Sequence, residues 1–137
     1  RPAWGLLSDV IGRERSLGLA FGLQAAVLLA WATMLDAPVA FVLFSALSTF
    51  SWGEVYSLFP ALAADLYGTR HVSANYGALY TGKGVASILA GPLASFAAEA
   101  ASWEAVVLTM AAASALDSAL ALHVLPRLVA RGTVLDS

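Results

Sequence analysis

Four apolar segments of membrane-spanning length follow one another along the 137-residue chain. They cover residues 16–34, 39–62, 74–98 and 105–125, with short polar stretches between them. A helix needs about 20 residues to cross the hydrocarbon core of a bilayer. Each segment is therefore predicted to be one transmembrane helix, and the predicted fold class is an all-α membrane protein, a polytopic helical bundle in a lipid bilayer.

The composition excludes several other classes of protein. Hydrophobic residues make up 60% of the chain and charged residues 12%, whereas soluble domains carry roughly 25% charged residues. The net charge of −2 leaves no basic face for nucleic acid. The chain has no cysteine, and no cluster of His, Asp or Glu has metal-ligand spacing. No serine lies in a nucleophile-elbow motif. We therefore expect neither an enzyme nor a metal or other cofactor.

The polar stretches complete the predicted layout. Residues 1–8 are predicted to end an earlier helix, 9–15 and 63–73 to be loops, and 126–137 to be a tail. The chain starts with Arg and not with Met, so we interpret it as a piece of a longer protein.

Basic residues outside the predicted helices indicate how the chain is oriented in the membrane. The second and fourth loops have none of them. By the positive-inside rule, loops 9–15 and 63–73 and the tail are cytoplasmic, in a multi-pass protein of the cell membrane. The residues concerned are Arg13, Arg15, Arg70, Arg127 and Arg131.

Two cations are predicted near the middle of the bilayer. At about 1.5 Å per helical residue, Arg1 lies roughly 12 Å and Lys83 roughly 14 Å from the cytoplasmic edge. Trp52 and Tyr56 fall at a similar depth, roughly 9–15 Å. Half the hydrocarbon thickness is about 15 Å, so these side chains converge on the midplane, where secondary transporters bind their substrates.

Helical spacing places polar side chains beside Lys83. Tyr76, Tyr80, Lys83 and Ser87 follow one stripe of the third span, and the second span carries a similar stripe of Ser45, Ser48, Trp52 and Tyr56. Hydroxyl groups and aromatic rings around a buried cation suit a small carboxylate anion. The alternatives are that these stripes serve packing alone and that Lys83 forms a structural ion pair with Glu54 or Asp117. A third stripe, Gly77, Gly84 and Gly91, predicts close approach of a neighbouring helix.

Several motifs resemble a known family. Gly5-Leu6-Leu7-Ser8-Asp9-Val10-Ile11-Gly12-Arg13 is similar to the G-x-L-x-D-x-x-G-R loop of the major facilitator superfamily, in the copy between transmembrane helices 8 and 9. The stretches at residues 1–5, 52–60 and 75–84 resemble the oxalate/formate antiporter family within that superfamily. The resemblance covers nearly the whole chain, from the end of helix 8 through helix 12.

The resemblance implies a carrier that exchanges small carboxylates by alternating access. It places substrate-binding positions on Arg1, Lys83, Trp52 and Tyr56, and Tyr80 joins them through its stripe. Asp9, Gly12 and Arg13 form the gating motif, and we expect Asp9 to dock on the helix that begins near Ser73. The N-terminal half of the same polypeptide supplies the rest of the pocket.

Three alternatives stay open at this point. One is a proton-linked monocarboxylate symporter of the same superfamily. The second is a membrane-anchor or cofactor subunit of an enzyme complex, and the third is a complete small exporter that works as a dimer. Glu54 is interpreted as a structural hydrogen-bonding residue, with proton coupling as the other possibility, and Asp117 as a packing contact with an upstream helix.

Overall fold

The computed structural model describes residues 2–51, 53, 58–68, 70 and 72–129, and these residues form helices joined by short turns. No strand occurs in these ranges, and the predicted all-α fold is confirmed. The helices are α1 (Pro2–Ile11), α2 (Arg13–Ala32), α3 (Pro38–Ser51), α4 (Leu58–Tyr67), α5 (Val72–Ala100) and α6 (Trp103–His123).

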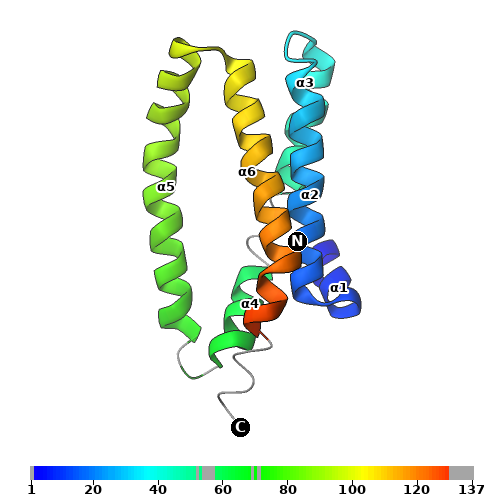
Figure 1. The fold of residues 1–137 in the computed structure, drawn as a ribbon, viewed down its shortest axis with the longest axis vertical. Coiled ribbons are helices and arrows are strands. Elements are labelled where there is room, and N and C mark those ends of the chain that lie inside the picture. The colour runs from blue at the N-terminus through cyan, green and yellow to red at the C-terminus, as the bar shows by residue number, and fades with distance from the viewer. Residues whose placement is uncertain (1, 52, 54–57, 69, 71, 130–137) are drawn as a thin grey trace.

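The long helices run up and down along one axis (Figure 1). The α2–α3 and α5–α6 connections lie at one end of the bundle, and the α1–α2 turn and the α4–α5 connection lie at the other. Arg13 and Arg15 lie in the first turn of α2, Arg70 lies between α4 and α5, and Arg127 follows α6. The predicted orientation in the membrane depends on this grouping of basic residues.

Two helical stretches of the described chain are long and apolar enough to cross a membrane. They are Arg13–Ala32, which is α2, and Trp103–Val129, which contains α6. At 29 residues α5 is longer than either, but its glycines, tyrosines and Lys83 make it less apolar. In the segment 39–62, which was predicted as one span, the structure describes α3 and the start of α4. Helix α4 continues to Tyr67, into the stretch 63–73 that was predicted as a loop.

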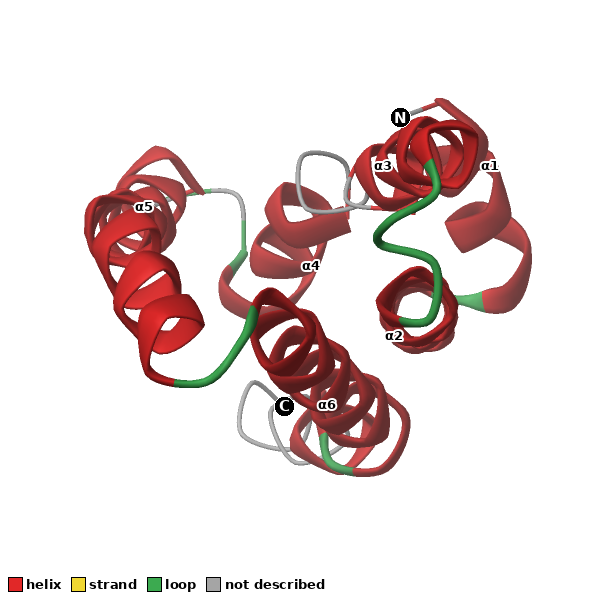
Figure 2. Cartoon of the chain, turned by 90° about the horizontal axis from the view of Figure 1, so that it is seen from above, coloured by secondary structure: helices red, strands yellow, loops and turns green. Residues whose placement is uncertain are grey.

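The tightest helix pair is α2 with α6, which lie side by side in both views (Figures 1 and 2). Gly18 and Gly22 on α2 allow the close approach. A Cβ atom on Gly18 would lie only 2.4 Å from Cγ of Leu122. The Ser118 hydroxyl donates a hydrogen bond of 2.7 Å to the Gly18 carbonyl oxygen. Small residues four apart thus bring two backbones together, as in many membrane helix pairs.

Gly77, Gly84 and Gly91 make no close helix contact within the described residues, and the approach of a neighbouring helix stays a prediction for the rest of the polypeptide. No neighbouring atom lies within 4 Å of the position that a Cβ would take on any of the three glycines. Their helix, α5, stands apart from the rest of the bundle along most of its length (Figures 1 and 2). The glycine spacing therefore does not mark a helix contact among these six helices.

The separation of α5 leaves a large apolar surface uncovered. Its exposed side chains include Val85, Ile88, Leu89, Leu93 and Phe96, and Ile88 is 75% exposed. In water such a patch would be unstable, whereas lipid chains or further helices would cover it.

The turn between α1 and α2 depends on Gly12. Its φ of 91° lies in the left-handed region, which glycine adopts without a steric cost. The Gly12 amide donates a hydrogen bond of 3.1 Å to the Ser8 carbonyl, and the Ser16 hydroxyl donates one of 2.9 Å to the Gly12 carbonyl. These bonds satisfy backbone groups where one helix ends and the next begins.

Candidate substrate site

A small cavity lies where α5 meets α2 and α4. Its volume is about 190 Å³. Among its described lining residues Lys83 carries the single charge, and the two tyrosines add hydroxyl groups. The lining residues are Phe21 from α2, Phe59 from α4, and Tyr76, Leu79, Tyr80 and Lys83 from α5.

Helical spacing on α5 brings the polar groups together. Tyr76 and Tyr80 are one turn apart, and their ring centroids are separated by 4.3 Å. The Lys83 Nζ lies 5.3 Å from the centroid of the Tyr80 ring, within the range of a cation–π interaction. All three side chains are half-buried. The predicted stripe of Tyr76, Tyr80 and Lys83 is thus present on one face, and its role in binding stays a prediction.

The cavity has the chemistry of an anion site. An ammonium group and phenolic hydroxyls can donate charge-assisted hydrogen bonds to a carboxylate. Phe21, Phe59 and Leu79 line the rest with apolar surface, which excludes water and strengthens such bonds. A site with one cation and a small volume favours a small anion over a large or cationic molecule.

Four residues that the sequence analysis singled out lie outside the described residues. They are Arg1, Trp52, Glu54 and Tyr56. Ser48, from the predicted stripe on the second span, is not among the residues that line the cavity. Its Oγ accepts a hydrogen bond of 2.7 Å from Gln24 Nε2.

Sequence reasoning missed Phe21 and Phe59. Their rings pack edge to face with centroids 6.5 Å apart and an interplanar angle of 79°. Neither residue belongs to a polar stripe, and apolar residues surround both in the sequence. Only the packing of α2 against α4 indicates that they share a site.

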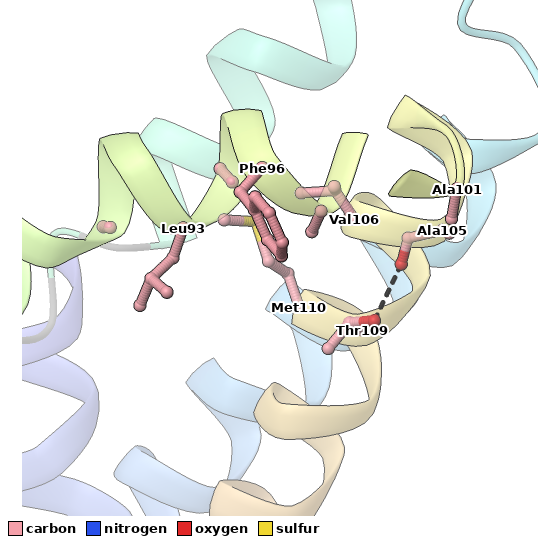
Figure 3. Close-up of a pocket in the computed structure, with 10 residues that line it drawn as sticks. Leu93, Phe96, Ala101, Ala105, Val106, Thr109 and Met110 are labelled. Atoms are coloured by element: carbon pink, nitrogen blue, oxygen red, sulfur yellow. Dashed lines mark hydrogen bonds between the residues drawn. The ribbon is translucent and has the colours of Figure 1, made fainter. Parts of the chain in front are cut away.

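A larger cavity lies between α5 and α6 and has different chemistry (Figure 3). Its volume is about 540 Å³, and apolar side chains such as Leu93, Phe96 and Met110 line it. Its one hydroxyl, on Thr109, donates a hydrogen bond of 2.7 Å to the Ala105 carbonyl. None of the described residues that line this cavity is charged. Size alone therefore does not identify the substrate site, and the polar groups favour the Lys83 cavity.

Asp117 lines a third cavity, of about 390 Å³, between α2, α4 and α6. Its side chain is exposed, and no described basic residue lies within salt-bridge distance of it. The same described residues contain no group of three His, Asp or Glu side chains that could hold a metal ion.

The predicted gating motif contributes an ion pair at one end of the bundle. Arg13 Nε donates to the Asp65 carboxylate, which links the start of α2 to α4. Asp9 is exposed near the end of α1, and Gly12 forms the turn described above. The docking of Asp9 near Ser73 stays a prediction. Asp65 as the partner of Arg13 was not anticipated.

This ion pair is expected to contribute little to stability. The Arg13 and Asp65 side chains are 33% and 53% exposed, and exposed ion pairs contribute about 0–1 kcal/mol. In a double-mutant cycle with Arg13→Ala and Asp65→Ala, we expect a coupling free energy below about 1 kcal/mol. Chemical unfolding of the detergent-solubilised protein measures it. A coupling above about 2 kcal/mol would contradict the exposed geometry.

Comparison with known proteins agrees with this architecture. The family model of the Major Facilitator Superfamily matches residues 1–134. The chain is 38% identical over 129 residues to the oxalate:formate antiporter of Oxalobacter formigenes, covering 93% of the chain and 31% of that protein. It is 34% identical over 91 residues to the uncharacterized MFS-type transporter YhjX of Escherichia coli (strain K12), covering 64% of the chain and 22% of that protein.

The chain thus spans less than a third of the length of each of these relatives. The family match nevertheless extends over nearly all of its residues, and the described helices suit a multi-pass membrane protein. The chain belongs to the Major Facilitator Superfamily.

Proposed function

We propose that the chain works as the C-terminal part of a secondary transporter that exchanges small carboxylates, with oxalate and formate as the substrates. The observation that carries this proposal is the cavity of about 190 Å³ in which Lys83 lies beside Tyr76 and Tyr80. The similarity to a protein named oxalate:formate antiporter supports the same substrates.

In this mechanism Lys83 supplies the charge that attracts the anion. Tyr76 and Tyr80 offer hydroxyl donors, and Arg1, Trp52 and Tyr56 complete the pocket. A carboxylate bound to Lys83 brings a negative charge to the positive one in an environment of low dielectric constant, which favours the occluded state when substrate is bound and permits the alternating movement. Such a cycle favours exchange over net flux.

The gating motif acts at the cytoplasmic end of the bundle. Gly12 and Arg13 hold the α1–α2 turn against α4, and Asp9 docks on the first turn of α5 when the gate closes. The tail is cytoplasmic, the protein resides in the cell membrane, and the N-terminal half of the polypeptide supplies the opposite wall of the pocket.

Membership of the superfamily is also compatible with a proton-linked monocarboxylate symporter. That function would require a carboxylate within the spans that binds and releases a proton, and Glu54 and Asp117 are the two candidates. Membership of a transporter superfamily disfavours the interpretation as a membrane-anchor subunit of an enzyme complex.

Counterflow in proteoliposomes tests the proposal. The complete transporter is reconstituted, the vesicles are loaded with oxalate, and uptake of labelled oxalate is followed, so that the exchange of one oxalate for another moves no net charge. We expect uptake to require the internal anion and to be unaffected by a protonophore. Uptake into vesicles without internal anion, driven by external acid and abolished by the protonophore, would instead indicate the symporter. Protein-free liposomes are the control.

A further inference from the structure

Two cavities of the structure share a wall. Phe21 and Phe59 line the Lys83 cavity of about 190 Å³, and the same two residues line the Asp117 cavity of about 390 Å³. Their rings are in edge-to-face contact, with centroids 6.5 Å apart. We call the second space the rear cavity. Since both rings border both spaces, they separate the small cavity that Lys83 lines from a larger one.

The rear cavity has two chemical properties that matter for a carboxylate. Most of its lining is aliphatic, with residues such as Leu17, Leu62 and Leu120. Asp117 is the only charged residue among the described residues that line it. A hydrocarbon tail would contact apolar surface there, whereas a second carboxylate would be repelled by the like charge of Asp117.

We infer that the Phe21–Phe59 pair limits the size of the transported acid, and that Asp117 excludes longer dicarboxylates from the space behind it. This inference rests on the proposed function. With both rings in place, an acid bound to Lys83 is confined to the smaller cavity, which suits formate, acetate or oxalate. Removing one ring joins the two cavities and opens a path for a longer chain.

In a variant that lacks one of the two rings, the gain in affinity over the wild type should then depend on the chain length of the acid. Each methylene group moved from water into an apolar cavity adds about a factor of four in affinity. For Phe59→Ala we expect hexanoate to inhibit oxalate exchange at a concentration at least tenfold lower than in the wild type. Adipate, which has the same chain length but ends in a second carboxylate, should gain less than threefold. In Phe59→Ala combined with Asp117→Asn, adipate should gain about tenfold as well.

Leu120→Ala is the matched control. Leu120 lines the rear cavity but not the Lys83 cavity, so its truncation adds space behind the rings and leaves both rings in place. We expect no gain for hexanoate in this variant. Phe21→Ala provides a second way to open the wall if Phe59→Ala does not fold, as judged by its elution profile in detergent.

The measurement is inhibition of labelled oxalate exchange by hexanoate and adipate in proteoliposomes that contain the complete transporter. Phe59→Ala or Phe21→Ala protein that exchanges oxalate but shows no gain for hexanoate overturns the size limit alone. An equal gain for adipate and hexanoate in Phe59→Ala overturns the role of Asp117. Absence of oxalate exchange in the wild type contradicts the proposed function itself, so the failures are distinguishable.

Discussion

Replacing Lys83 by glutamine is expected to abolish most of the oxalate exchange by the complete transporter. Lys83 is the only charged residue among those that line the described part of the cavity, and glutamine keeps the length and polarity but not the charge. Losing one partner of a desolvated charge pair costs about 2–5 kcal/mol. This corresponds to roughly a 30-fold to several-thousand-fold loss of affinity for the anion. Initial rates of counterflow over a range of oxalate concentrations measure the effect.

Two further variants test whether the loss of exchange is specific to the positive charge at position 83. Lys83→Arg keeps the charge but places a planar guanidinium beside Tyr80, so we expect partial activity. Arg127→Gln removes a basic residue that is exposed beyond the end of α6, and we expect unchanged exchange. Undiminished exchange by Lys83→Gln protein would remove Lys83 from the mechanism and, with it, the main support for the proposed function.

The second large effect is expected at the contact between α2 and α6. In Gly18→Ala the new methyl group would lie 2.4 Å from Cγ of Leu122, so the helices must separate or Leu122 must change its rotamer. Overpacking of this kind costs about 1–3 kcal/mol. Separation would also lengthen the hydrogen bond from Ser118 to the Gly18 carbonyl. We expect a lower midpoint of thermal unfolding in detergent, measured on the complete transporter.

A second substitution, which should restore stability, tests the clash between the added methyl group and Leu122. Leu122→Ala removes the atoms that the methyl group added at position 18 would meet, so we expect the double variant to recover part of the loss. Gly22→Ala is the matched control one turn along α2, where the nearest atom to the added methyl group is the Ser118 hydroxyl oxygen at 3.3 Å. Alanine is the better helix former, which offsets part of this tighter contact, so we expect a smaller loss than for Gly18→Ala. Equal destabilisation by Gly18→Ala and Gly22→Ala would contradict the clash with Leu122.

The sequence best predicted the features that depend on a single helix or a single motif. The all-α class follows from the apolar segments, and the grouping of Tyr76, Tyr80 and Lys83 follows from the geometry of one helix. The resemblance to the major facilitator superfamily is confirmed by the family match. In each case the pattern lies within one segment or one motif, so no knowledge of helix packing is required.

The contacts between helices that the structure shows were not predicted. Small-residue spacing occurs on both α2 and α5, but among the described residues it is the glycines of α2 that meet a partner, because packing decides which stripe is used. The Arg13–Asp65 pair joins residues 52 positions apart. Phe21 and Phe59 lie in apolar surroundings that give no sign of a shared cavity. A partner on another helix cannot be read from periodicity within one helix.

The position of α5 away from its neighbours has a consequence for how substrate affinity and movement are related. The ammonium group of the site is on α5, whereas its phenylalanine rings are on α2 and α4. A ligand bound among them would link α5 to α2 and α4, and any free energy used to move these helices closer is subtracted from its observed affinity. In the proposed carrier, tight binding and large helix movement therefore oppose each other, and a moderate affinity for the anion is expected.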